Sequence, residues 1–274
     1  MQSPGAPQFS FPVPGRVLKA VLATLFAIWL VFALAGWADA GGPTFALLVG
    51  NQAAISQGQL WRLFTAPLLH IPSGSLSHIL WTLLGMYFLG TSLEKSWGEA
   101  RFLRFLIATA VLSYASQFVL GALLPAATAS KMMPPIYFGA MPVVHAIAIA
   151  WACSFRDRTV QLMFVLPIRS SVLIWIVVGM GLLSLIAQQM PPSGHLANFA
   201  AMGWGYLLGG GTPSPLREML LRYRLGNLRR QIEQEKKQRQ RRAKKSGLTV
   251  IPGGRKTEDE SDPNGKPTDK KLLN

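Results

Sequence analysis

Residues 136–155 read IYFGAMPVVHAIAIAWACSF and contain no Asp, Glu, Lys or Arg. A helix needs about 20 predominantly apolar residues to cross a hydrocarbon core about 30 Å thick, so this run is long enough. Working outward, five further stretches are similarly apolar: 18–37, 76–93, 102–124, 160–188 and 195–210. The stretch 160–188 contains Pro167, so its helix begins either at Val160 or near Ile168. Six such stretches predict an all-α polytopic membrane protein with six transmembrane helices.

The composition excludes several other classes of protein. Half of the 274 residues are hydrophobic and only 14% are charged, whereas soluble domains have about 25% charged residues and disordered chains have low hydrophobicity. The single cysteine, Cys153, excludes an intramolecular disulfide and a Cys-rich zinc site. The net charge of +15 is concentrated in residues 216–274, which hold 17 Lys/Arg against 8 Asp/Glu. The chain is therefore an apolar body with a basic tail.

The distribution of Lys and Arg predicts the orientation of the spans. Basic residues precede the first span, lie between the second and third and between the fourth and fifth, and follow the sixth, while the opposite loops carry only Arg62 and Lys131. By the positive-inside rule both termini are cytoplasmic, and the short loops suggest a bacterial inner membrane. The first span, which ends before Ala38-Asp39-Ala40, also resembles a signal peptide, but we interpret it as a retained helix.

The first external loop, residues 38–75, is too long to be a simple turn. Trp61 and Arg62 in this loop suit the membrane interface, where an aromatic ring and a snorkelling cation are both stable. They are candidates for contacts with lipid or with a client protein. The loop is expected to form a short amphipathic helix lying on the bilayer.

Polar side chains inside spans are costly, so each is a candidate functional residue. Those in or at the ends of the spans are His78, Thr82, Glu94, His145, His195 and Asn198. Each histidine either makes an interhelical hydrogen bond or binds a metal, but no carboxylate or cysteine reinforces a metal cluster, so neither a metal nor a cofactor is expected. Glu94, at the cytoplasmic end of its helix, is expected to cap a helix or to pair with Lys95 or Arg101.

The last span contains glycines at close-packing positions. Gly205 and Gly209 form a Gly-x-x-x-Gly pattern, and Gly203 precedes them. Small residues at this spacing allow two helix backbones to approach closely. The sixth helix is therefore expected to lie in the middle of the bundle.

An ordered series of motifs resembles the rhomboid family across about residues 16–211. The series runs from residues 58–70, GQLWRLFTAPLLH, through His78, Gly90, Leu93 and Glu94, Trp97-Gly98, Arg101-Phe102 and residues 164–169, FVLPIR, to Gly205-x-x-x-Gly209. The resemblance implies a rhomboid-like bundle of six helices. In active rhomboids, a serine in Gly-x-Ser-Gly on the fourth helix pairs with a histidine on the sixth, and a histidine and an asparagine on the second help to stabilise the oxyanion.

This sequence departs from that pattern at nearly every catalytic position. Met141 stands at the serine position, and Pro142 replaces the second glycine of the motif. Counting back from Gly205, the histidine position is occupied by Asn198, which cannot act as a general base. On the second helix His78 is kept, whereas Thr82 stands at the asparagine position.

The resemblance therefore implies a rhomboid pseudoprotease that binds or guides transmembrane client proteins. The alternative is a divergent intramembrane serine endopeptidase. A shifted register would provide His195 as a base but would not provide a nucleophile. Ser77 is next to His78 and Ser193 is next to His195, but neither serine has a base at the spacing that the fold would require. Whether the chain is an enzyme thus stays open, with inactivity favoured. If the fourth and sixth helices pack as in rhomboids, His145 and Asn198 face each other and hydrogen-bond in place of the Ser–His pair.

The chain is expected to divide into four regions. These are a cytoplasmic tail at 1–17, the membrane domain at 18–211, a basic amphipathic helix at 212–245 and a disordered tail at 246–274. Residues 217–245 carry 12 Lys/Arg and three Glu, with apolar residues at helical spacing as far as Ile232. Anionic lipid is the expected partner of the tail. A coiled coil or RNA are the alternatives, and no specific nucleic acid is expected.

Overall fold

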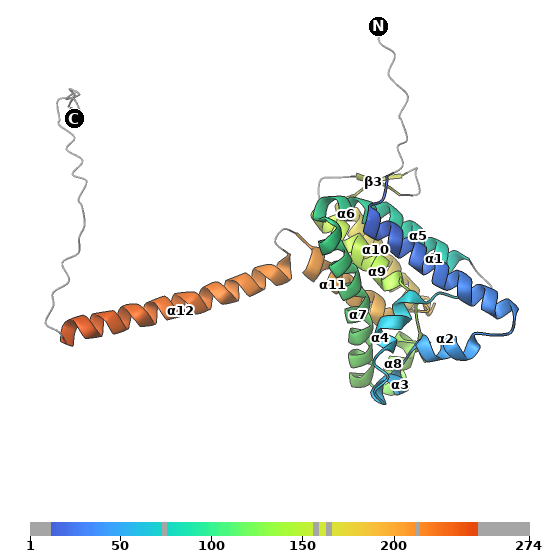
Figure 1. Ribbon diagram of the computed structural model, residues 1–274, viewed down its shortest axis with the longest axis horizontal. Helices are drawn as coiled ribbons and strands as arrows, with labels where there is room; N and C mark the ends of the chain where they lie inside the picture. Colours follow the sequence, from blue (N-terminus) through green and yellow to red (C-terminus); the bar gives the residue numbers. More distant parts are fainter. Residues whose placement is uncertain (1–11, 73–75, 156–158, 163–165, 212–213, 246–274) are drawn as a thin grey trace, which may run out of the picture. The chain divides into compact units, whose positions relative to one another are not determined.

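The computed structural model describes residues 12–72, 76–155, 159–162, 166–211 and 214–245, and the fold of this part is mostly helical (Figure 1). The longer apolar helices are α1 (Arg16–Trp37), α7 (Glu99–Leu123), α9 (Met141–Ser154), α10 (Ser170–Ile186) and α11 (His195–Gly209). The second predicted span is helical from α5 (Ser77–Gly85) through the π-helical turn η2 (Met86–Gly90) to α6 (Thr91–Trp97). Short elements fill the loops: α2 (Gly42–Leu48), α3 (Gln52–Ser56), α4 (Arg62–Thr65), η1 (Ala66–Leu68) and α8 (Ala126–Met132).

Two small antiparallel sheets precede two of the predicted helices and set where these helices begin. β2 (Ile136–Tyr137) pairs with β1 (Gly50–Asn51), so the helix predicted from residue 136 begins only at Met141. The backbone of Gly139 has φ of +110°, in the left-handed region that a continuing helix cannot adopt. β3 (Thr159–Leu162) pairs with β4 (Leu166–Arg169), so the next helix begins at Ser170, which is close to the predicted start near Ile168 and excludes a start at Val160.

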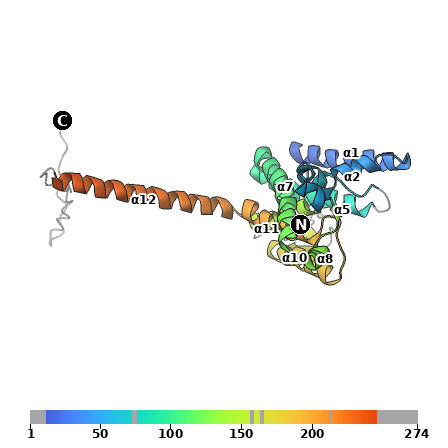
Figure 2. The ribbon, with the colours of Figure 1, turned by 90° about the horizontal axis from the view of Figure 1, so that it is seen from below.

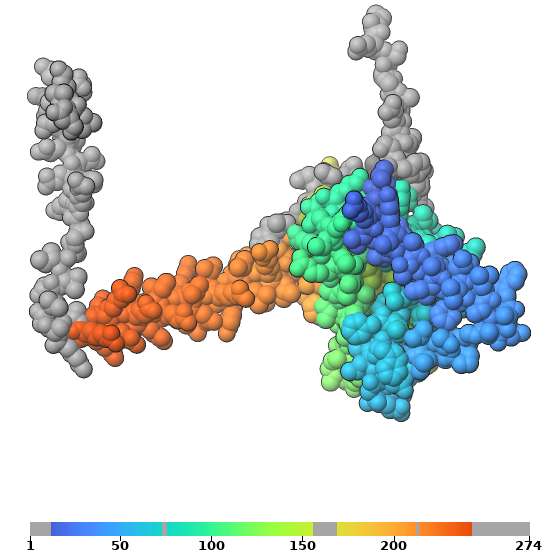
Figure 3. Space-filling model, in the orientation of Figure 1, coloured from blue at the N-terminus to red at the C-terminus, as the bar shows by residue number. Residues whose placement is uncertain are grey.

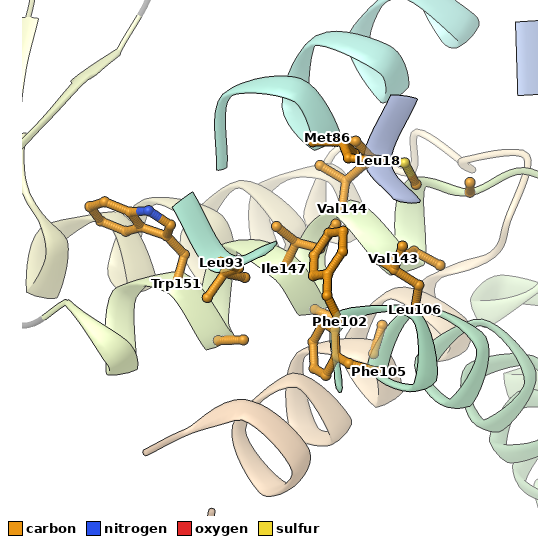
Figure 4. Packing of buried hydrophobic residues seen from close by; sticks show 14 of the residues in the cluster. Leu18, Met86, Leu93, Phe102, Phe105, Leu106, Val143, Val144, Ile147 and Trp151 are labelled. Atoms are coloured by element: carbon orange, nitrogen blue, oxygen red, sulfur yellow. The ribbon is translucent and has the colours of Figure 1, made fainter. Parts of the chain in front are cut away.

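The helix α9 lies at the centre of the bundle. It packs against α7, α10, α11 and η2, and ten of its 14 residues are buried. Its sequence is apolar on every face, which is the pattern of a helix surrounded by protein. Figure 4 shows Phe102 and Phe105 of α7, Leu18 of α1 and Ile147 of α9 converging in this core.

The outer helices have the opposite pattern, with large apolar side chains on the molecular surface. On α1 and α10 these include Val31, Leu34, Trp37, Trp175, Leu183 and Ile186, all more than half exposed. Soluble monomers rarely expose so much contiguous apolar surface. In the described part of the chain, α1 and α7 are each long and apolar enough to cross a membrane by themselves, while α9 and α10 are shorter apolar helices.

Glu94 connects the helices α6 and α1. Its buried carboxylate accepts hydrogen bonds from the backbone N–H groups of Val17 (2.9 Å) and Leu18 (3.3 Å). It therefore caps the first turn of α1, where unpaired N–H groups and the helix dipole favour an anion. Gly15 makes room for it, since a Cβ there would lie within 2.6 Å of all three carboxyl atoms.

The basic helix α12 (Pro215–Lys245) follows the bundle. It is one uninterrupted helix of 31 residues (Figure 2). The backbone contacts divide the chain after Leu221, so most of α12 belongs to a separate unit. The predicted tails at 1–11 and 246–274 lie outside the described residues.

Candidate functional site

The site is built around the segment that leads into α9. The Gly139 N–H donates to the Ala66 carbonyl at 2.9 Å, and the Gly139 carbonyl accepts from Tyr114 Oη at 2.7 Å. Tyr114 is fully buried and its ring stacks on that of Tyr137, with 5.5 Å between the centroids. These contacts fix the peptide immediately before Met141, the first residue of α9.

Two histidines lie against this segment. A Cβ on Gly139 would lie 2.8 Å from His78 Cε1, so only glycine allows the His78 ring this position. The His78 and His70 rings are 4.9 Å apart at their centroids. His78 Nδ1 accepts from the Ile71 N–H at 3.5 Å, which leaves Nε2 to carry the proton, and Nε2 is buried without a hydrogen bond.

His70 is the more deeply enclosed of the two histidines. Its side chain is 1% exposed, and neither ring nitrogen makes a hydrogen bond of normal geometry. The pKa of His70 is lowered to about 3, mainly by burial and secondly by the nearby His78 ring. The Leu68 carbonyl has a smaller effect that raises the pKa. His70 is therefore neutral at physiological pH.

A polar chain connects α9 with α11. Asn198 Oδ1 accepts a hydrogen bond from Ser193 Oγ at 2.9 Å, and the Asn198 side chain lies near the His145 ring of α9. His145 Nδ1 is buried and unpartnered. The Ser193 hydroxyl therefore donates its hydrogen bond to an amide oxygen, which does not act as a base at neutral pH.

Gln117 supports the start of α11 from the side of α7. Its Oε1 accepts from the Ala197 N–H at 2.9 Å, and a Cβ on Gly194 would lie only 2.4 Å from the same oxygen. Gln117, Tyr114 and His70 were not among the site residues predicted from the sequence. Gln117 was detectable, because it is a polar residue inside a predicted span. Nothing in the sequence distinguishes Tyr114.

The remaining predicted site residues are not brought together. Thr82 is fully buried and donates to the His78 carbonyl of its own helix at 2.8 Å, so its hydroxyl is not a donor to the site. Pro142 is buried, and the half-buried Met141 packs against the core. The buried His195 ring stacks on Phe199, 6.5 Å away. In the described ranges no group of three or more His, Cys, Asp or Glu could hold a metal.

Arg62 is placed differently from the interfacial position expected for it. Only 7% of Arg62 is exposed, and its guanidinium donates to Val49 O (2.6 Å), Ala46 O (2.7 Å) and Gln59 Oε1 (2.8 Å). It therefore holds the first loop together rather than reaching lipid. Trp61 is 46% exposed and bonds through Nε1 to Leu47 O at 3.3 Å, so its ring remains available to lipid.

The glycines of α11 differ in what they contact. A Cβ on Gly205 would lie 2.5 Å from the Ala146 carbonyl oxygen, and one on Gly209 would lie 2.5 Å from Ala150 Cβ. Both glycines therefore allow α11 to touch α9. A Cβ on Gly203 would meet nothing within 4 Å, so the packing role predicted for Gly203 is not found.

Sequence comparison agrees with this arrangement. The rhomboid domain matches residues 57–211, which is more than half of the chain and includes η2, α9 and α11. The protein belongs to the rhomboid family and is a membrane protein. It is similar to the Rhomboid protease GluP of Bacillus subtilis (strain 168), with 26% identity over 160 residues. That alignment covers 57% of this chain but only 28% of GluP, so the chain spans less than a third of this relative.

Proposed function

We propose that this rhomboid-family protein has no serine protease activity and binds transmembrane segments of client proteins. The observation that supports the proposal best is the thioether of Met141 at the first position of α9, beside the fixed Gly139 peptide. A thioether has no proton to lose and cannot form an acyl-enzyme. At the position of the base, Asn198 accepts a hydrogen bond instead of taking a proton.

The same proposal includes the membrane topology. It comprises six spans, formed by α1, α5–η2–α6, α7, α9, α10 and α11, with both termini in the cytoplasm of a bacterium. The exposed apolar side chains of the outer helices support this arrangement, since they suit contact with lipid or with a client helix. On α5 they include Leu80, Trp81 and Leu84, and on α10 Trp175 and Leu183.

The alternative function is proteolysis by a relocated nucleophile. Ser193 and His195 are both buried near the start of α11, which is the observation in its favour. Against it, the Ser193 hydroxyl donates to Asn198 Oδ1, and the His195 ring stacks on Phe199. Neither arrangement activates a nucleophile.

Cleavage of a reporter transmembrane substrate in liposomes tests the proposal. The reporter carries a photocrosslinker in its transmembrane segment, and an active rhomboid serves as the positive control. We expect no cleavage by the wild type or by Met141→Ala, and crosslinking of the intact reporter to both. Cleavage that persists in Met141→Ala but is lost in Ser193→Ala or His195→Ala would instead establish the alternative. Absence of both cleavage and crosslinking would contradict client binding while leaving inactivity in place.

A further inference from the structure

The helix α12 has an apolar stripe of exposed side chains. Leu221, Leu225, Leu228 and Ile232 follow one another at spacings of four, three and four residues, which places them on one face of a helix. Each is more than two-fifths exposed. After Ile232, α12 has no further large apolar residue, and its last 13 residues are mainly Lys, Arg, Gln and Glu. The stripe is therefore confined to the half of α12 that is nearer the bundle in sequence.

Arginines flank the stripe on both sides. In the seven-residue repeat that the stripe defines, Arg217 and Arg224 occupy one flank and Arg222 and Arg229 the other. If two copies of α12 paired through the stripe, these flanks would face each other in either orientation. Like charges at flanking positions disfavour pairing, so the sequence opposes a coiled coil between two copies. The flanks are instead complementary to a surface with negative charge.

The bundle places the start of α12 where such a surface is expected. Arg101 Nη2 lies 3.5 Å from the Gly211 carbonyl, and its guanidinium carbon lies 4.5 Å above the Trp97 ring. The end of α11 is thus held at the turn between α6 and α7, which also carries Lys95 and Arg104. Arg217 is close enough to Arg101 to interact with it electrostatically. Basic side chains therefore gather at the end of the bundle from which α12 begins.

We propose that residues 217–232 of α12 form an amphipathic helix that docks on the anionic lipid surface of the same membrane, with the Leu/Ile stripe in the acyl boundary and the flanking arginines on lipid phosphates. The sign of the charge and the width of the stripe both fit an interfacial helix, which combines a narrow apolar face with basic flanks. Docking of this kind depends on anionic lipid and weakens with salt.

The test uses the full-length protein with a Cys153→Ala background and one environment-sensitive label. The label is attached at Leu228→Cys, on the stripe, or at Gln234→Cys, a matched position on the opposite face of α12. Each protein is reconstituted in vesicles of phosphatidylcholine alone and in vesicles where phosphatidylglycerol replaces about a third of it. The readouts are the emission wavelength and quenching by quencher-bearing lipids, with a spin label at the same positions to detect a second copy.

We expect the label at position 228 to enter lipid only in the anionic vesicles, while the label at 234 stays in water. Replacing the four flanking arginines with Gln is expected to reduce the docked fraction at least tenfold, since each basic residue near the surface contributes about fivefold to binding. The same replacement would strengthen a coiled coil, because it removes the repulsion between copies.

Three results would overturn the proposal. A label at 228 that stays in water in both kinds of vesicle would show that the stripe does not enter lipid, and a protein partner would then be the expected occupant. Equal immersion in both vesicles would show that charge does not direct docking. Spin–spin coupling between copies that increases when the arginines are replaced would identify a second copy as the occupant of the stripe.

Discussion

At the scale of single residues, the site contains more buried polar atoms than it can pair within the described structure. His78 Nε2, His145 Nδ1 and both nitrogens of His70 are enclosed without hydrogen bonds. A buried polar group without a partner costs about 1–3 kcal/mol, so such a cluster is not optimised for stability alone. Under the proposed function, these histidines line a site in which Met141 stands at the position of the nucleophile.

The enclosed His70 leads to a prediction about pH. The pKa of His70 is about 3 in the folded protein, because of burial first and the His78 ring second, and about 6.5 in the unfolded chain. Between these values the unfolded chain binds a proton that the folded protein does not, so stability decreases as the pH falls from 6.5 towards 3. The loss is about 1.4 kcal/mol per pH unit at most, and it amounts to about 2 kcal/mol between pH 6.5 and 4.5.

Thermal unfolding in detergent between pH 8 and 4.5 would measure this loss. His70→Phe keeps an aromatic ring and has no proton to bind, so its unfolding temperature should depend less on pH than that of the wild type. An identical pH dependence in the two proteins would show that His70 is not the group responsible.

The polar chain through Asn198 leads to a second prediction. His145→Phe removes the side chain that faces Asn198 and should lower the unfolding temperature by several degrees, because a lost hydrogen bond and an unsatisfied amide each cost about 1 kcal/mol or more. His145→Gln keeps a hydrogen-bonding group and should recover part of the loss. Unchanged stability in His145→Phe would mean that this contact does not hold α9 and α11 together.

At the scale of secondary structure elements, the close approach of α9 and α11 depends on the absence of a side chain at particular glycines. Gly205→Ala would place a methyl group 2.5 Å from the Ala146 carbonyl oxygen and 2.7 Å from Ala146 Cα. These are backbone atoms, so the two helices must separate, and we expect a loss of about 3 kcal/mol or more.

Gly203→Ala is the matched control on the same helix. A methyl group there meets nothing within 4 Å, and alanine has the higher helix propensity by about 1 kcal/mol. Its unfolding temperature in detergent should therefore equal or exceed that of the wild type. If both variants were tolerated equally, the close contact between α9 and α11 would be refuted.

The elements also show where sequence reasoning succeeds. The apolar stretches predicted α1, α7 and α11 within a few residues, because length and hydrophobicity determine them locally. The start of α9 was missed because it depends on pairing with a distant segment, where Ile136 meets Asn51. The start of α10 at Ser170 lies close to Ile168, one of the two predicted starts. At the site, the residue types at 141 and 198 are readable from sequence, whereas the support of Gly139 by Tyr114 depends on tertiary packing.

At the scale of the whole molecule, the proposed six spans require an explanation of how short central helices would cross the membrane. With 14 and 15 residues, α9 and α11 are about 21–23 Å long, less than the hydrocarbon thickness of about 30 Å. Non-helical backbone at membrane depth is stable only where protein satisfies its polar groups. Before α9 this condition is met, since Phe138 N–H donates to Pro192 O and Gly139 N–H to Ala66 O.

Six spans and two spans predict opposite positions for two surface residues. With six spans and a cytoplasmic N-terminus, Lys95 after the second span faces the cytoplasm, and Ser130 after the third faces outward. If only α1 and α7 crossed the membrane, Lys95 would face outward and Ser130 inward.

We therefore introduce Lys95→Cys or Ser130→Cys, both at exposed positions, into a Cys153→Ala background. A membrane-impermeant maleimide applied to intact spheroplasts should label the variant at 130 at once and the variant at 95 only after permeabilisation. Because the Lys/Arg distribution sets orientation through the short loops, the reverse pattern would refute the combination of six spans with a cytoplasmic N-terminus.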